Sequence, residues 1–244
     1  MSRQKKLQKL KRRRERALSA RPWDAPEKWK QQPVQDPPPG YASYTVTDEP
    51  MPDAEGGGET LEQILGNEGL ERLHGLVKEN PHAAIAELTP LLEAHPDIPV
   101  IYNWLQSAYS LAGNAQKSEE LIHRLYQRHP NYLFGRVAYA QLLLRRKEIK
   151  KAAEVFNHTW NLKAHYPQRS EFHITEFVAF ASIYILYHFH TGDMRAVDAM
   201  FQAMKGIAPD SEVTQEIAGL LSSPDVAAIR LVAKALLGSK RRRR

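Results

Sequence analysis

Apolar residues recur three and four positions apart through the middle of the chain, with polar residues between them. Clear groups are Leu88–Leu92, Leu121–Leu125 and Ala152–Phe156. This spacing places the apolar side chains on one face of an α-helix. No stretch of useful length alternates between apolar and polar residues, which is the pattern of a half-buried strand. The pattern therefore predicts an all-α fold built from amphipathic helices.

The expected helices end at regular intervals. Pro96 and Pro130 lie 34 residues apart, and each follows a histidine that closes an amphipathic stretch. Proline and the residue before it disfavour helix, so both positions are helix ends. Between them the sequence predicts a helix, a turn at Gly113–Asn114 and a second helix. Further turns between helices are expected at Lys147–Glu148 and Gly192–Asp193.

A helix–turn–helix period of 34 residues resembles that of the tetratricopeptide repeat, over residues 61–210. That family has bulky or apolar residues at fixed positions of both helices, a small residue early in the second helix, and a proline at its end. Four units supply matching residues: Ala84, Leu88, Leu91 and Pro96; Tyr102, Leu105, Tyr109, Ser118, Ile122, Leu125 and Pro130; Tyr139, Leu143, Ala152 and Phe156; Tyr184, Gly192, Phe201 and Pro209. The resemblance implies a right-handed solenoid of about four stacked helical hairpins.

The chain departs from the family pattern at two places. A position that is usually small in the first helix holds Gln106 in the second unit. The third unit has Ala164 where proline is expected and Pro167 three residues later, and an insertion follows around Tyr166–Phe172. An unrelated array of helical hairpins is the alternative interpretation.

The resemblance also implies a binding surface, because the first helices of successive repeats line a concave groove in this family. The family's groove positions fall on Val100, Asn103, Ser107, Ser110 and Leu111; Phe134, Val137, Gln141, Leu144 and Arg145; Ala179, Ser182, Leu186, Phe189 and His190. Asn103 alone matches the Lys, Arg and Asn pattern with which some members clamp a C-terminal carboxylate. We therefore expect a protein partner that offers an amphipathic helix or an extended apolar segment.

Two further helices are expected after the repeats, over Ser211–Leu220 and Pro224–Leu237. Ser223 and Pro224 form a helix start, and Gly238 is a helix end. We expect residues 211–238 to cap the solenoid.

The net charge of +6 hides a division between the ends of the chain and its middle. Residues 1–30 hold twelve Lys or Arg against three Asp or Glu, and residues 239–244 hold five Lys or Arg. The candidate polyanion-binding residues are Lys5, Lys6, Lys9, Lys11, Arg12, Arg13, Arg14, Arg16, Arg241, Arg242, Arg243 and Arg244. Such runs neutralise phosphates and release counterions, which favours RNA, DNA or ribosome contact. A nuclear-import signal at Lys9–Arg16 and, less favoured, an anionic membrane surface are the alternatives.

Residues 1–30 are expected to be a disordered basic tail and residues 31–60 a mobile linker. The linker contains six prolines, a glycine run, six acids and no Lys or Arg, so it has little to bury. Its acids suggest a pseudo-ligand that folds back on the basic tail. Trp23 and Trp29 either stack on unpaired bases or, as we favour, pack on the repeats.

Composition excludes several chemistries. The chain has no cysteine, which rules out disulfides, thiolate zinc sites and cysteine nucleophiles and fits a reducing compartment. The most apolar stretch, Phe177–Phe189, is too short to span a membrane, and the N-terminus lacks an apolar signal core. No catalytic motif is present, and although His158, His165 and His173 lie around one irregular connection, ordinary surface histidines are the favoured interpretation. We expect a cytoplasmic protein, nuclear if the source is eukaryotic, with no catalysis, cofactor, metal or membrane span.

The function expected is that of a non-catalytic scaffold that binds a protein partner in the groove, with basic tails that attach it to nucleic acid or a ribonucleoprotein. The alternative is a nucleic-acid- or ribosome-associated protein that acts mainly through its tails. Salt separates the two, because tail binding to phosphate collapses as salt rises and burial of an apolar segment does not. The oligomeric state stays open.

Overall fold

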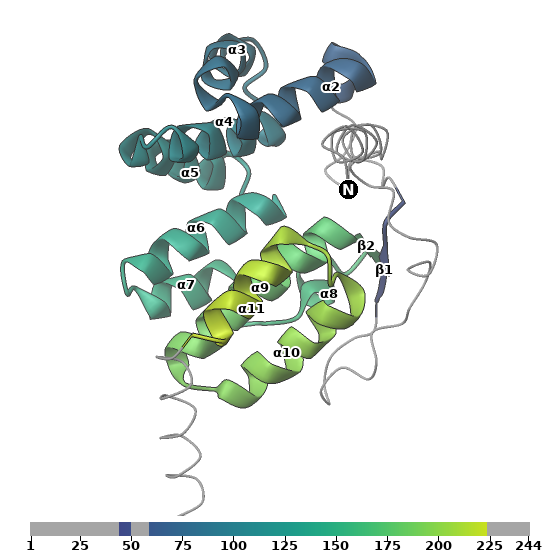
Figure 1. Ribbon diagram of the computed structural model, residues 1–244, viewed down its shortest axis with the longest axis vertical. Helices are drawn as coiled ribbons and strands as arrows, with labels where there is room; N and C mark the ends of the chain where they lie inside the picture. Colours follow the sequence, from purple (N-terminus) through teal and green to yellow (C-terminus); the bar gives the residue numbers. More distant parts are fainter. Residues whose placement is uncertain (1–43, 50–58, 224–244) are drawn as a thin grey trace, which may run out of the picture.

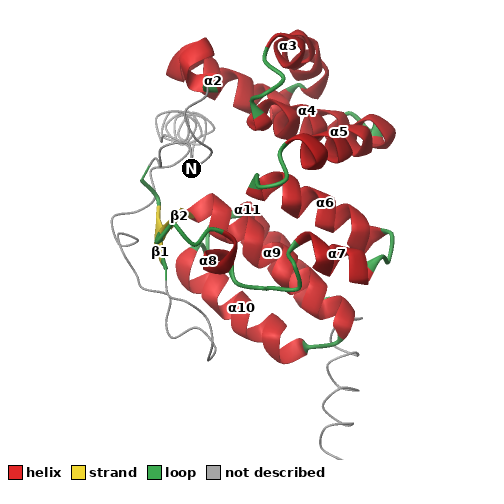
Figure 2. Ribbon diagram, turned by 180° about the vertical axis from the view of Figure 1, so that it is seen from behind, coloured by secondary structure: helices red, strands yellow, loops and turns green. Residues whose placement is uncertain are grey.

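The computed structural model describes residues 44–49 and 59–223, which form a stack of helices with two short strands at one edge (Figure 1). The helices are α2 (Leu61–Glu79), α3 (Pro81–Ala94), α4 (Pro99–Leu111), α5 (Ala115–Arg128), α6 (Leu133–Arg145), α7 (Ile149–Val155), α8 (Leu162–His165), α9 (Ile174–Thr191), α10 (Met194–Ile207) and α11 (Glu212–Leu221). The strands are β1 (Thr45–Thr47) and β2 (Glu171–His173). The predicted all-α class is confirmed as a mostly helical fold, in which helices also dominate the view of Figure 2.

Consecutive helices pack as pairs joined by short turns. The pairs are α4 with α5, α6 with α7, and α9 with α10, and α11 packs on α9 and α10. The helix expected over Ser211–Leu220 is present, within one residue at each end, as α11. The expected last helix over 224–237, the tails 1–30 and 239–244, and the rest of the linker lie outside the described residues. Among the described helices, none combines the length and the apolar character needed to cross a membrane.

The turns after α4, α6 and α9 share one geometry. Each has a residue in the left-handed region, Gly113, Lys147 or Gly192, with φ of 78°, 61° and 80°. The N–H of that residue donates to the carbonyl three positions back, and the next N–H donates to the carbonyl five positions back. These paired bonds satisfy the last carbonyls of a helix and stop it.

A second recurring geometry ends α3, α5, α8 and α10. The residue after each helix has φ near −130° and ψ near 65°, and a proline follows it. These four residues are His95, His129, Tyr166 and Ala208. The proline ring disfavours the helical region for the residue before it, and these residues, with positive ψ, lie outside that region. Pro167 therefore ends the third unit as Pro96 and Pro130 end theirs, although it stands three residues late.

The late proline results from a break in the second helix of the third unit. That helix was expected to continue through Phe156, but α7 ends at Val155 and the chain resumes helix only at Leu162. Asn157 and His158 both adopt positive φ, at 49° and 54°, which no helix accommodates. The periodic pattern of Ala152, Val155 and Phe156 did not reveal the break. All three side chains are buried, as they would be in an unbroken helix, and they precede Asn157.

Two expectations are wrong for residues 44–49. They do not all belong to a mobile linker, and they include a β-strand. Thr45–Thr47 pair in parallel with Glu171–His173, so that Val46 faces Phe172 in the register. Val46 is buried, and the ring of Tyr44 lies 5.2 Å from the ring of Phe172 in an edge arrangement. The insertion around Tyr166–Phe172 supplies the partner strand that makes this segment part of the domain.

Candidate partner-binding surfaces

The groove positions implied by the repeat resemblance divide into buried and accessible side chains. Val137, Leu144 and Ser182 are buried, so their assignment as ligand contacts is wrong. Helix α6 packs against both α7 and α9, and Val137 and Leu144 belong to the cluster of apolar side chains between them. Ser182 donates its hydroxyl to the carbonyl of Ala179 at 2.8 Å inside α9.

The groove residues of α4 are the most accessible group. Val100, Asn103 and Ser107 are half-buried, Ser110 is exposed, and Leu111 is exposed over 59% of its surface. Ser107 donates its hydroxyl to the carbonyl of Asn103 at 2.9 Å, so its donor is already used within the helix. What α4 leaves for a partner is mainly apolar.

On α6 and α9 the predicted lining contributes less. Phe134, Gln141 and Leu186 are half-buried, and Arg145 is exposed at the end of α6. Of the other groove positions, Ala179 and Phe189 are half-buried and His190 is exposed.

Trp104 is a candidate contact that the family positions do not include. It is half-buried, and its ring lies 5.2 Å from that of His74 on α2. Val100, Trp104 and Leu111 are spaced at i, i+4 and i+11, which places them on one side of α4. We call this set the α4 face. The apolar spacing of Val100, Trp104 and Leu111 is the signal that identifies the α4 face in the sequence. Tyr102 and Leu105, on the opposite side of the same helix, are buried in the core.

The unusual Gln106 takes a structural role between α4 and α5. Its side-chain carbonyl accepts a hydrogen bond from the hydroxyl of Ser118 at 3.3 Å, and its amide donates to the hydroxyl of Ser107 at 2.9 Å. A polar pair thus replaces the contact of two small residues at the crossing of these helices.

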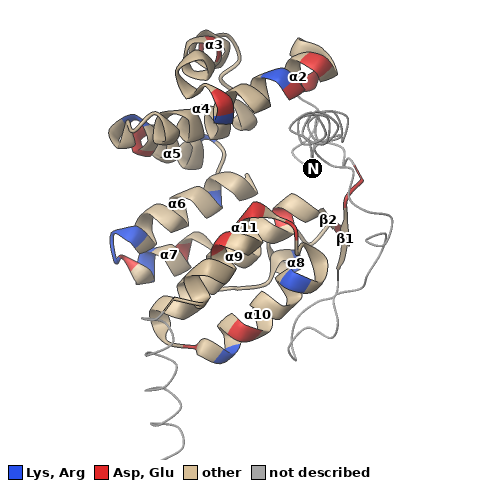
Figure 3. Ribbon diagram, viewed as in Figure 1, with Lys and Arg blue, Asp and Glu red and all other residues tan. Residues whose placement is uncertain are grey.

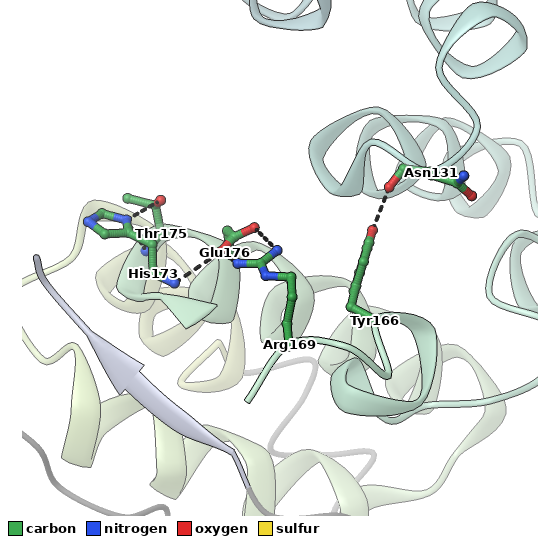
Figure 4. A network of polar contacts seen from close by, with 6 residues as sticks. All are labelled: Asn131, Tyr166, Arg169, His173, Thr175 and Glu176. Carbon is green, nitrogen blue, oxygen red and sulfur yellow. Dashed lines mark hydrogen bonds and ion pairs between the residues drawn. The ribbon is translucent and has the colours of Figure 1, made fainter. Parts of the chain in front are cut away.

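A polar network fixes the insertion that docks β1, as Figure 4 shows. The phenol of Tyr166 donates to the carbonyl of Asn131 at 2.7 Å and ties the insertion to the start of α6. Arg169 forms two hydrogen bonds with Glu176, of 2.9 and 2.6 Å, and both side chains are largely buried. The guanidinium of Arg169 also lies 4.4 Å from the centre of the Phe172 ring, so cation–π attraction adds to the ion pair.

The start of α9 is closed by the same network. Glu176 accepts from the backbone N–H of His173, and the imidazole of His173 accepts from the N–H of Thr175, which is a reciprocal cap. The His173 ring is largely buried, and this desolvation lowers its pKa. The cap fixes β2 directly before α9.

Arg136 is a buried cation that stabilises the break after α7. It donates from Nε and Nη2 to the carbonyl of Val155, at 3.2 and 2.7 Å, and lies 4.7 Å from the centre of the Phe156 ring. It also faces Nδ1 of His165 at 3.2 Å, while His165 Nε2 donates to the carbonyl of Thr159. Burial, together with the Arg136 charge, lowers the pKa of His165.

These contacts assign His165 and His173 to structural roles, and His158 is exposed. His165 binds backbone and Arg136, and His173 caps α9. Within the described ranges, no group of three His, Asp or Glu side chains is placed to hold a metal ion. The basic candidates Lys5–Arg16 and Arg241–Arg244 lie outside those ranges.

The fold and its surfaces describe a protein of paired antiparallel helices with an apolar face on α4 and a strand-docking insertion before α9. No family model matches the chain, and no curated protein and no solved structure matches it.

Proposed function

We propose that the protein is a non-catalytic interaction scaffold whose helical hairpins form a tetratricopeptide-like solenoid and whose α4 face binds a protein partner. The observation that carries the proposal is Leu111, a large apolar side chain exposed over 59% of its surface beside the half-buried Trp104 and Val100. Apolar anchors with an aromatic among them are the residues that dominate binding energy at protein interfaces.

The repeat arrangement is supported by the positions of the helices. Helices α4 and α6 begin 34 residues apart, at Pro99 and Leu133, and α5 and α7 begin 34 residues apart, at Ala115 and Ile149. A helical pair cannot cover both of its faces alone, so stacked pairs share their apolar surfaces. On the first helix α4 this stacking leaves Leu111 exposed to a ligand.

The ligand we propose is an amphipathic helix or an extended apolar segment of a partner protein. Asn103 is the single residue of the α4 positions that suits a carboxylate clamp, and its side-chain carbonyl already faces the Gln106 amide at 3.5 Å. The apolar anchors and the lack of lysine or arginine on α4 favour burial of apolar side chains over charge recognition.

The basic runs at the two ends of the chain support electrostatic attachment to nucleic acid or a ribonucleoprotein as an addition to partner binding. A nucleic-acid- or ribosome-associated protein that acts mainly through these runs is the second candidate, favoured by the same observation. Both candidates are compatible with a cytoplasmic protein, or a nuclear one in a eukaryote.

Affinity capture from native lysate, with nuclease and at high salt, tests the proposal with a matched pair of variants. Leu111→Asp places a charge on the α4 face, and Leu220→Asp places the same charge on α11, where Leu220 is 38% exposed. We expect a specific protein that survives nuclease and salt, and whose recovery falls at least about tenfold with Leu111→Asp but not with Leu220→Asp. Captured proteins that all disappear with nuclease would instead favour the second candidate.

A further inference from the structure

The turn between α6 and α7 carries the densest positive charge in the described part of the chain. Five of the seven residues from Arg145 to Lys151 are Lys or Arg, and all five are exposed. Figure 3 shows this segment as blue ribbon, the colour of Lys and Arg, at one end of the α6–α7 pair. We call this segment, residues 145–151, the basic turn. The other described residues include more Asp and Glu than Lys and Arg, so the rest of the described domain carries a net negative charge.

Three of the five cations have no acidic partner among the residues that the structure describes. Arg146 forms an ion pair with Glu119 on α5 at 2.6 Å, and Lys151 pairs with Glu148. Within the described residues, no ion pair is formed by Arg145, Lys147 or Lys150. Their charges are therefore available to a ligand at the surface.

Lys147 holds a backbone conformation that its side chain disfavours. It has φ of 61° at the turn position where the neighbouring units have Gly113 and Gly192. An added Cβ at either glycine meets no atom within 4 Å, so the position demands only the left-handed conformation, which glycine adopts without strain. Residues kept in strained conformations are concentrated at functional sites. Lys147 is exposed, and within the described part of the chain no ion pair of its side chain accounts for this conformation.

A nucleic acid suits this charge distribution better than an acidic protein does. The chain carries further basic runs in residues 1–30 and 240–244, so its positive charge is divided among three separated segments. A phosphodiester backbone repeats its charge along its whole length and can engage several such segments at once, which multiplies their affinities. Helix α11 ends toward the same side of the view as the basic turn in Figure 1. Arg145 adds a planar guanidinium that matches phosphate oxygens.

We propose that the basic turn binds the phosphate backbone of a nucleic acid, with Arg145, Lys147 and Lys150 as the contacting residues. This site belongs to the folded domain and is separate from the α4 face. Its test is therefore independent of the test of partner binding.

Fluorescence anisotropy with the full-length protein tests the proposal. The probes are a labelled single-stranded RNA of about 20 nucleotides and a duplex DNA of the same length, titrated over a range of salt concentrations. The test variant is Arg145→Gln with Lys147→Gln and Lys150→Gln. The control, Lys117→Gln with Arg195→Gln and Lys205→Gln, makes the same change in net charge at exposed positions elsewhere.

We expect the test variant to bind the nucleic acid roughly tenfold more weakly than the control. The plot of log K against log salt should also be less steep for the test variant, by about two in the magnitude of its slope. Tighter binding of one probe identifies RNA or DNA as the ligand, and either result supports the site. Equal affinities and equal slopes for the two variants would overturn it. Tighter binding to polyglutamate of matched charge, lost in the same test variant, would overturn the nucleic-acid assignment in favour of an acidic protein.

A single substitution separates a binding role of Lys147 from a structural one. Lys147→Gly relieves the backbone strain and is expected to raise the melting temperature while it weakens binding to the nucleic acid. A higher melting temperature with unchanged affinity would contradict the role of Lys147 in the site.

Discussion

Gly113 and Lys147 lie 34 residues apart and adopt the same left-handed backbone conformation with the same two backbone hydrogen bonds. The N–H of Asn114 donates to the carbonyl of Tyr109, and the N–H of Glu148 donates to that of Leu143, both five positions back. The period that the apolar pattern indicates is therefore also a property of the backbone.

Substitutions at Gly113 and Lys147 should change the free energy of unfolding in opposite directions. Gly113→Ala forces a Cβ into the left-handed region and should lower the free energy of unfolding by about 1 kcal/mol, whereas Lys147→Gly should raise it by up to about 1 kcal/mol. Urea denaturation of the two variants measures both changes. If Gly113→Ala proved neutral, the turn would not need the conformation that the structure gives it.

The strand segment should contribute to stability as part of the domain. Val46→Ser removes a buried apolar side chain from the contact with α9 and should cost about 2 kcal/mol. Thr45→Ser, on the exposed neighbour, keeps a hydroxyl at that position and should cost well under about 1 kcal/mol. Thermal unfolding compares them, and equal melting temperatures would show that residues 44–49 do not dock.

The Arg169–Glu176 pair should be worth far more than a surface ion pair. Its side chains are 16% and 14% exposed, against 57% and 43% for Arg72 and Glu87. Arg169→Met leaves a largely buried carboxylate without its counter-ion and should cost about 3 kcal/mol, while Arg72→Met should cost less than about 1 kcal/mol.

A double-mutant cycle isolates the interaction between Arg169 and Glu176. The double variant Arg169→Met with Glu176→Leu should be less destabilised than the sum of the two single variants, because no buried charge is left unpaired. Additive losses in urea denaturation would show that the two side chains do not stabilise each other.

Stability should fall as the solution becomes mildly acidic. Burial is the first cause that lowers the pKa of a group of histidines, namely His74, His129, His165, His173 and His188. The unfolded chain then binds more protons than the folded chain below the ordinary histidine pKa of about 6.5, so the free energy of unfolding decreases as pH falls through that region.

Urea midpoints at about pH 7.5 and about pH 5, at constant ionic strength, measure this loss. His188 is informative because its Nε2 is buried without a hydrogen-bond partner among the described residues, and its ring packs 4.3 Å from that of Tyr184. His188→Phe keeps an aromatic ring and should reduce the pH dependence, because it removes a histidine whose pKa is lowered by burial. A midpoint that does not move between the two pH values would contradict the account.

The regular parts of the fold could be predicted because local chemistry alone specifies them. Pro96 and Pro130 end helices through their own ring geometry, and Gly113 and Gly192 end them by adopting positive φ. The break after Val155 and the pairing of Thr45–Thr47 could not be predicted, because they depend on partners far along the chain. The buried Arg136 that binds the Val155 carbonyl is one such partner, and the insertion that carries β2 is the other.

The candidate site was only partly predictable for the same reason. Family positions identify which side of a first helix faces the groove, but the packing of α6 against α9 decides that Val137 and Leu144 are covered. On α4 the matching positions stay accessible, and Leu111 is the most exposed of the large apolar side chains there. Trp104 lies one helical turn from Val100, and the apolar spacing along α4, not the family pattern, is the sequence signal that identifies it.

Hydrogen–deuterium exchange of the full-length protein, with and without a partner recovered by capture, tests the central claim most directly. If the α4 face is the binding surface, the partner should slow exchange in residues 99–111 and in the part of α2 around His74 that lies against Trp104. Protection confined to α10 and α11, or to the turn at residues 145–151 alone, would contradict a scaffold that binds its partner through α4.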